Sequence, residues 1–249
     1  MSTVDPNTLP PTMSRAMGEI NRYHEYLWDK VSPHIGNRVI EIGVGFGQYS
    51  RKMLDDNKSL LGCDIDEGHL TALKSSSDSP LLQTLHLDLC TPGTGTIEKC
   101  LEFNADTIIL LNVLEHIKDH EAALSFLNKA VPSGAKLIII VPAMPLLYNG
   151  LDREAGHFRR YGKKDLQKIL KDSNWSILRN EYFNMPGIPG WLIAGILSKF
   201  GKAGTELNAP STNILLKIYD RFFVQASIVT DPFCKHIAGL NILNVSVKR

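Results

Sequence analysis

Three glycines at alternate positions, directly after a short apolar run, constrain this chain more than any other feature. The run Val39-Ile-Glu-Ile42 is followed by Gly43, Gly45 and Gly47. A short apolar run of this kind is typical of a buried parallel strand, and the glycines indicate a tight turn whose backbone passes close to a ligand. A second apolar run, residues 59–63, ends in Asp64, twenty-one residues after Gly43. An acid at that spacing is suited to binding ribose hydroxyls.

Apolar runs and helical patterns alternate along most of the chain. This alternation predicts a Rossmann-like, seven-stranded, mostly parallel sheet with helices on both faces and a cap after the fifth strand. Strands are expected at residues 38–42, 59–63, 82–87, 107–111, 136–141, 175–182 and 242–247. A leading helix with apolar residues Met13, Met17, Ile20, Leu27 and Val31 is expected to end near Pro33 and Gly36. Further helices are expected at 49–56, 121–130, 163–172 and 213–227.

Four motifs in this frame resemble those of class I S-adenosylmethionine (SAM) dependent methyltransferases. Glu41-Ile-Gly-Val-Gly-Phe-Gly47 resembles their first motif, and Gly62-Cys-Asp-Ile-Asp66 their acidic end of the second strand. Leu85-His-Leu-Asp-Leu89 is similar to the end of the third strand, and Asn112-Val-Leu-Glu-His-Ile117 to the fourth-strand signature. The resemblance implies the fold above, with the last strand inserted antiparallel, and SAM as the cofactor, released as S-adenosylhomocysteine.

The resemblance also implies which residues bind SAM. Asp64 would accept hydrogen bonds from the ribose diol, and Asp88 one from the adenine amino group, although Asp88 also suits a plain turn. Glu41 would organise the loop. Tyr23 would cover the methionine end of SAM. Equally, Tyr23 belongs to the apolar face of an amphipathic helix. The expected cofactor residues are Glu41, Gly43, Gly45, Gly47, Tyr23, Asp64, Ile65, Asp88, Leu89, Asn112, Val113 and His116.

No metal ion is expected. Some relatives carry Glu-x-x-Glu-His at the end of the fourth strand, and a divalent metal is associated with those acids. This chain has Asn112 in the first place, followed by Glu115 and His116. The loss of one carboxylate leaves a poor all-oxygen site for a hard cation.

The segment after the fifth strand resembles a bacterial-type subgroup of the family with Gly-His-x-Arg-Arg-Tyr. Its sequence is Leu147-Tyr-Asn-Gly-Leu-Asp-Arg-Glu-Ala-Gly-His-Phe-Arg-Arg-Tyr161. The later segment Asn184-Met-Pro-Gly-Ile-Pro-Gly-Trp191 extends the match. One departure from the subgroup is Asn149, which stands between Tyr148 and Gly150. His157 is a candidate general base, with Tyr161 beside it. Alternatively, His157 and Arg160 fasten the loop through Asp152 and backbone carbonyls. The candidate acceptor-binding residues are Tyr148, Arg159, Arg160, Asn184 and Trp191.

Composition limits the partners and the domain organisation. The 249 residues carry a net charge of +1, which gives no electrostatic case for nucleic acid. The apolar runs are shorter than a membrane-spanning helix requires, and no signal peptide is visible. The four cysteines lack Cys-x-x-Cys spacing, which is typical of reduced thiols. A cytoplasmic monomer or homodimer is expected, with one domain over residues 1–249: a tail and helix at 1–35, a cofactor-binding half at 36–145, and cap segments at 146–172 and 184–238.

The function expected from these patterns is methyl transfer from SAM to a small organic acceptor through oxygen, nitrogen or carbon. A lipid-linked or glycolipid acceptor is an alternative. A nicotinamide (NAD) dependent oxidoreductase would share the glycine turn and the acid, but it usually has Gly-x-Gly-x-x-Gly, and position 48 is Gln. A non-catalytic scaffold would not need Gly43, Gly45, Gly47 and Asp64.

Overall fold

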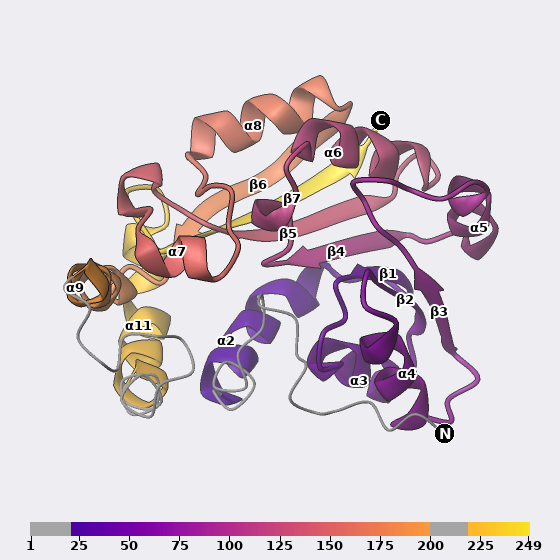
Figure 1. The fold of residues 1–249 in the computed structure, drawn as a ribbon, viewed down its shortest axis with the longest axis horizontal. Helices are drawn as coiled ribbons and strands as arrows, with labels where there is room; N and C mark the ends of the chain where they lie inside the picture. The colour runs from indigo at the N-terminus through magenta and orange to yellow at the C-terminus, as the bar shows by residue number, and fades with distance from the viewer. Residues whose placement is uncertain (1–20, 200–218) are drawn as a thin grey trace.

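One seven-stranded sheet organises the protein. The structure, a computed structural model, describes residues 21–199 and 219–249. The strands run in the spatial order β3-β2-β1-β4-β5-β7-β6 (Figure 1). Their bounds are β1 Arg38–Ile42, β2 Ser59–Asp64, β3 Leu82–His86, β4 Thr107–Leu111, β5 Lys136–Pro142, β6 Trp175–Phe183 and β7 Asn241–Lys248.

The predicted fold class is confirmed. Strands β1 to β5 pair in parallel, and β7 inserts antiparallel between β5 and β6. Each predicted strand matches an observed one to within one residue at either end. The strand order reverses direction between β1 and β4, which is the position where open α/β sheets bind their ligands, outside the carboxyl ends of the strands.

The sheet is apolar because helices cover both of its faces. Successive residues of a strand point to opposite sides, so Ile108 and Leu110 join one core while Ile109 joins the other. Helices α5, α6 and α8 supply the first core and α2, α3 and α11 the second. The helix bounds are α2 Asn21–Val31, α3 Gln48–Asp55, α4 Glu67–Ser75, α5 Thr96–Phe103, α6 His120–Lys129, α7 Gly150–Glu154, α8 Lys163–Asp172, α9 Gly187–Lys199 and α11 Val224–Cys234.

Four of these helices, α4, α5, α7 and α9, were not predicted. The start of α9 has the sequence Gly187-Ile-Pro-Gly190, which is typical of turns. Pro189 is tolerated because the first turn of a helix has no intrahelical partner for its backbone N–H groups. Helix α7 is short, and its side-chain caps, rather than apolar periodicity, define it.

Two predicted helices need comment. The predicted helix at 213–227 is wrong in its end: a π-helical turn at Tyr219–Phe223 leads into α11, which continues to Cys234 and accommodates Pro232 in its last turn. Its first residues lie outside the described part of the chain. The leading helix was predicted to end near Pro33 and Gly36; its α-helical part ends at Val31, and a 3-10 turn at Ser32–His34 follows. Met13, Met17 and Ile20 lie outside the described residues.

Helices α7, α9 and α11 gather at one end of the sheet (Figure 1). Helix α7 contacts α9, and α11 contacts both β6 and α2. The isolated bridge between Ala143 and Tyr161 returns the chain to the end of β5. These elements therefore lie beside the end of the sheet where β5 finishes, next to the edge where the glycine loop lies.

Candidate active site

The glycine loop leaves β1 in a conformation that side chains oppose. Gly43, Gly45 and Gly47 have φ values of 79°, 50° and 70°, in the left-handed region. A Cβ on Gly43 would lie 2.6 Å from Val113 Cγ2, so both sterics and backbone strain favour glycine there. Gly47 then caps the start of α3. The glycines thus allow a tight turn at the carboxyl edge of the sheet.

Glu41 lies beneath this loop, inside the protein. Its carboxylate accepts a hydrogen bond from the Ser50 hydroxyl of α3, which ties the strand to the helix. Burial raises the pKa of Glu41 to about 8, although the hydrogen bond from Ser50 acts in the opposite direction. The contacts of Glu41 are those of a residue that organises the loop from behind.

Asp64 is placed where β2 meets the glycine loop. Its carboxylate accepts hydrogen bonds from the backbone N–H of Gly45 at 3.1 Å and of Asp66 at 2.9 Å. Burial alone would raise the pKa of Asp64, but the close contact with His69 and the hydrogen bonds from the backbone outweigh it, so the pKa lies below its ordinary value. Two carboxylate oxygens offer about four acceptor positions, so capacity for a diol remains.

His69 is a contact that the sequence patterns did not predict. Its Nδ1 lies 3.3 Å from Asp64 Oδ2, because α4 returns over the loop. A histidine five residues after a strand-end acid carries no signal of its own in the sequence. Ile65, by contrast, is 63% exposed directly beside Asp64, as an apolar surface for a flat ligand would be.

The end of β3 adopts the turn that was the alternative for Asp88. Its carboxylate accepts hydrogen bonds from Cys90 N and Thr91 Oγ1, each at 2.7 Å. Leu89 is buried in the core. A contact between Asp88 and an adenine ring remains a prediction.

Tyr23 and Asn112 approach the same edge from opposite sides. Tyr23 is buried, and its hydroxyl donates to Asn241 Oδ1 at 3.5 Å. Burial, and then the nearby Glu115 carboxylate, raise the pKa of Tyr23 well above its ordinary range. Asn112 ends β4 with a φ of 56°, which turns the chain sharply toward Val113. Contact of Tyr23 and Asn112 with the cofactor remains a prediction.

A buried ion pair fastens the segment after β5. Asp152 is fully buried and accepts from Arg160 Nε at 2.8 and 2.9 Å and from His157 Nδ1 at 2.9 Å. Arg160 also donates to the Ala143 carbonyl oxygen and lies over the Trp191 ring at 4.4 Å. These are the contacts expected of residues that fasten the loop, so the guanidinium of Arg160 is already engaged within the protein.

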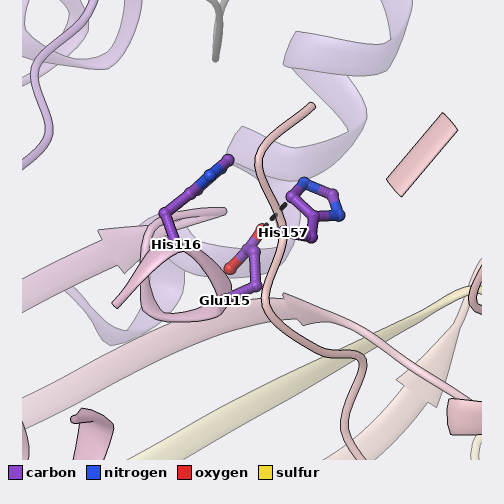
Figure 2. A group of neighbouring side chains, drawn as sticks. All are labelled: Glu115, His116 and His157. Carbon is purple, nitrogen blue, oxygen red and sulfur yellow. Dashed lines mark ion pairs between the residues drawn. The ribbon is translucent and has the colours of Figure 1, made fainter. Parts of the chain in front are cut away.

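The other side of His157 faces the turn after β4. Its Nε2 lies 4.0 Å from Glu115 Oε1, and its ring packs edge-on against His116 with centroids 4.8 Å apart (Figure 2). Glu115 is fully buried, and burial raises its pKa to about 8. Burial, then the neighbouring His157, lower the pKa of His116 to about 4. Neither Glu115 oxygen, nor Nδ1 of His116, has a hydrogen-bond partner.

Tyr161 and Arg159 support the loop from within. The Tyr161 hydroxyl donates to the Leu114 carbonyl oxygen at 3.1 Å and pairs with His120 Nδ1 at 2.9 Å. Arg159 donates to the Lys118 carbonyl oxygen at 2.8 Å. Tyr161 therefore fastens the loop to the turn after β4 and to α6. Its proposed contact with a reacting group remains a prediction.

The remaining candidate acceptor residues also make internal contacts. Tyr148 donates to the carbonyl oxygen of His157 at 2.7 Å, and Trp191 Nε1 to that of Leu147 at 3.2 Å. Asn184 is fully buried, where its backbone N–H donates to Asp231 and its side-chain amide to Asn241. These side chains therefore contact other parts of the protein, and their contact with an acceptor remains a prediction.

The residues at the carboxyl edge fit a nucleoside-bearing ligand. The left-handed glycines, of which Gly43 is exposed, lead into the start of α3, whose N-terminus favours negative charge. Asp64 lies beside them with unused acceptor capacity, and Ile65 offers apolar surface. Together they match the carboxylate, ribose and base of such a ligand.

Comparison with known proteins identifies the family. A family model described as a methyltransferase domain matches residues 14–180, which is more than half of the chain. The chain belongs to this methyltransferase family. Its resemblance to class I SAM-dependent methyltransferases is thereby confirmed. No curated protein matches the chain significantly.

Solved structures agree in fold at low sequence identity. A SAM-dependent methyltransferase from Mesorhizobium loti matches with a TM-score of 0.58 and 13% identity, over 92% of this chain and 100% of that one. A phosphoethanolamine N-methyltransferase from Haemonchus contortus, in complex with SAM, matches with a TM-score of 0.59 and 15% identity, over 91% and 52%. The [4+2]-cyclase SpnF matches with a TM-score of 0.57 and 14% identity, over 97% and 84%. The fold alone therefore does not fix the reaction.

Over residues 21–199 and 219–249, no helix has the length and apolar character needed to cross a bilayer.

Proposed function

We propose that this chain transfers a methyl group from SAM to a small organic acceptor bound beside the ends of β4 and β5. The observation that carries the proposal is the loop of Gly43, Gly45 and Gly47 beside Asp64, within a chain of the methyltransferase family. The loop and the acid suit an adenosine ligand, and the family membership selects SAM over NAD.

Each part of the edge has a distinct role in binding the cofactor. The start of α3 binds the methionine carboxylate, which the glycine turn allows to come close, and Asp64 accepts from the ribose hydroxyls. Ile65 covers the base. When bound, SAM supplies a methyl group already activated on a sulfonium, so the protein mainly positions the acceptor and excludes water.

His157, in the segment after β5, is the candidate proton acceptor. Its Nδ1 donates to Asp152, which leaves Nε2 with its lone pair directed toward the turn after β4. A base held in one tautomer in this way can take a proton from an acceptor hydroxyl or amine. The described parts of the cap segments, residues 146–172, 184–199 and 219–238, then enclose the acceptor.

Isothermal titration calorimetry tests the cofactor. SAM and S-adenosylhomocysteine should bind, and NAD should not. Binding of NAD without any response to SAM would refute the proposal and favour the oxidoreductase alternative. Once an acceptor is found, His157→Gln should lower turnover while SAM affinity stays unchanged, whereas a purely fastening role predicts a lower melting temperature and a higher KM for the acceptor.

One observation favours a lipid-linked acceptor as a second candidate. Helices α9 and α11 and the turn after α11 expose large apolar side chains, namely Leu192, Ile193, Ile196, Ile228, Val229, Phe233 and Ile237. Apolar side chains exposed together on neighbouring elements are suited to contact with acyl chains. The protein should then sediment with phosphatidylcholine vesicles, and Phe233→Asp should reduce the sedimented fraction; no sedimentation would leave the water-soluble acceptor.

A further inference from the structure

The turn after β4 and the segment after α7 bring three metal-ligating side chains together. Glu115 and His116 belong to the 3-10 turn Leu114–His116, and His157 follows α7. One ligand atom from each lies within 4.8 Å of the other two. The backbone N–H of Phe158 donates to the Glu115 carbonyl oxygen at 2.9 Å, so the two segments are fixed to each other. The cluster is therefore part of the framework and does not depend on a chance approach of side chains.

Three buried polar atoms of this cluster, on Glu115 and His116, have no hydrogen-bond partner among the described residues. Glu115 is fully buried, and both of its carboxylate oxygens are without a hydrogen bond, as is the buried Nδ1 of His116. Buried polar atoms in native proteins are nearly always paired, and each exception calls for an explanation such as an ion. Two adjacent side chains with unpaired atoms, directed at the same space, point to a ligand between them.

His157 has the orientation of a metal ligand. Its Nδ1 donates to Asp152, so its Nε2 presents a lone pair toward Glu115, 4.0 Å away. A carboxylate behind a histidine fixes the tautomer and ring orientation in many metal sites. Asp152 is held in turn by Arg160 and by the backbone N–H of Asn149, so this outer layer is complete.

We propose that Glu115, His116 and His157 bind a divalent transition-metal ion, with coordination positions left open for water or an acceptor oxygen. Two imidazoles and one carboxylate suit Zn²⁺ and similar ions, whereas Mg²⁺ and Ca²⁺ prefer oxygen ligands alone. Ligands of tetrahedral Zn²⁺ at ~2.0–2.1 Å lie ~3.3–3.5 Å from one another. Small side-chain rotations therefore suffice to close the present spacings.

This site shares Glu115 and His116 with the one that the sequence excluded, and it differs in its third ligand, His157. The prediction of no metal considered Asn112 and the acids of the β4 turn as an all-oxygen site. His157 lies about forty residues further along the chain, and only the fold places it against Glu115. Binding of the ion does not depend on the proposed methyl transfer, although an acceptor oxygen in an open position does. An ion on Nε2 of His157 would occupy the lone pair that a free general base needs, so His157 would act as base only in the metal-free protein.

Metal-free full-length protein provides the test. Zn²⁺ should bind with one equivalent per chain in competition with a chromophoric chelator, and Co²⁺ should give a visible absorption band. Glu115→Gln and His157→Gln should each weaken Zn²⁺ binding at least ~100-fold, because loss of even an outer-layer partner costs ~10–100-fold. His86→Asn, a change at an exposed histidine, should leave binding unchanged and serves as the matched control.

Three results would overturn the proposal: no stoichiometric binding, equal binding by the wild type and both ligand variants, or equal loss in the His86→Asn control. Circular dichroism checks that each variant is folded, and the wild-type stoichiometry is decisive by itself if a variant is not. SAM titration of the same metal-free protein separates the two proposals. Zn²⁺ binding without SAM binding would refute only the methyl transfer, and SAM binding without Zn²⁺ binding only the metal site.

Discussion

Removal of the Asp152 carboxylate should destabilise the protein strongly. Asp152 is fully buried and is the only acidic group to which Arg160 donates at 2.8–2.9 Å among the described residues. Burial by itself raises the pKa of Asp152, but the hydrogen bonds from His157 and Arg160 lower it by more, so the pKa lies below its ordinary value. The carboxylate is therefore ionised in the folded protein. Asp152→Ala leaves the Arg160 guanidinium buried without its counterion.

The expected loss follows from this burial. Breaking a buried ion pair by removing one partner costs ~3–5 kcal/mol, since the remaining charge stays desolvated. Arg160 keeps the Ala143 carbonyl oxygen and the Trp191 ring, so the lower half of this range, ~3–4 kcal/mol, is expected. For a protein of this size that loss lowers the melting temperature by ~6–16 °C.

Urea denaturation followed by circular dichroism measures the effect. The matched control is Asp172→Ala, which removes the acid of an exposed ion pair with Lys168 and should change stability little. A double variant, Asp152→Asn with Arg160→Met, should recover part of the loss, because neither residue then carries a charge. If Asp152→Ala were as stable as Asp172→Ala, the ion pair would not be what fastens the segment after β5.

Three further predictions concern the cofactor edge. Asp64→Ala should weaken SAM binding by ~1.5–3 kcal/mol in calorimetry through loss of charge-assisted hydrogen bonds, and an unchanged Kd would mean that the acid only holds the loop. Gly43→Ala should lower the free energy of unfolding more than Gly95→Ala, since both have φ near 78° but only Gly43 would clash, with Val113; equal losses in urea denaturation would rule the clash out. Glu41→Gln should flatten the pH dependence of stability: the pKa of Glu41 rises from 4.5 to about 8 on folding, so the folded protein binds more protons and stability falls as pH rises through that window. Equal slopes for the wild type and Glu41→Gln in urea denaturation from pH 4.5 to 8 would contradict that assignment.

The sheet and the cofactor edge could be predicted because their signals are local. A strand covered on both faces must be apolar along its length, as Lys136–Pro142 is, and a left-handed turn must be glycine-rich. The spacing from Gly43 to Asp64 is the length of the glycine loop, one helix and one strand, so it can be recognised in the sequence alone. Helices such as α7 and α9 escaped prediction because caps and packing, rather than periodicity, define them.

The partners of each polar side chain were decided by the tertiary structure alone. The sequence placed Glu115 and His116 at the end of β4 and His157 in the segment after β5, but their meeting depends on how α7 folds back against the β4 turn. Fastening of the loop through Asp152 was one of two interpretations of His157 and Arg160. The structure shows that both side chains donate to the buried Asp152 carboxylate. The residue types that line the edge are thus written in the sequence, whereas desolvation and pairing, which set their charge and chemistry, arise only when distant segments pack together.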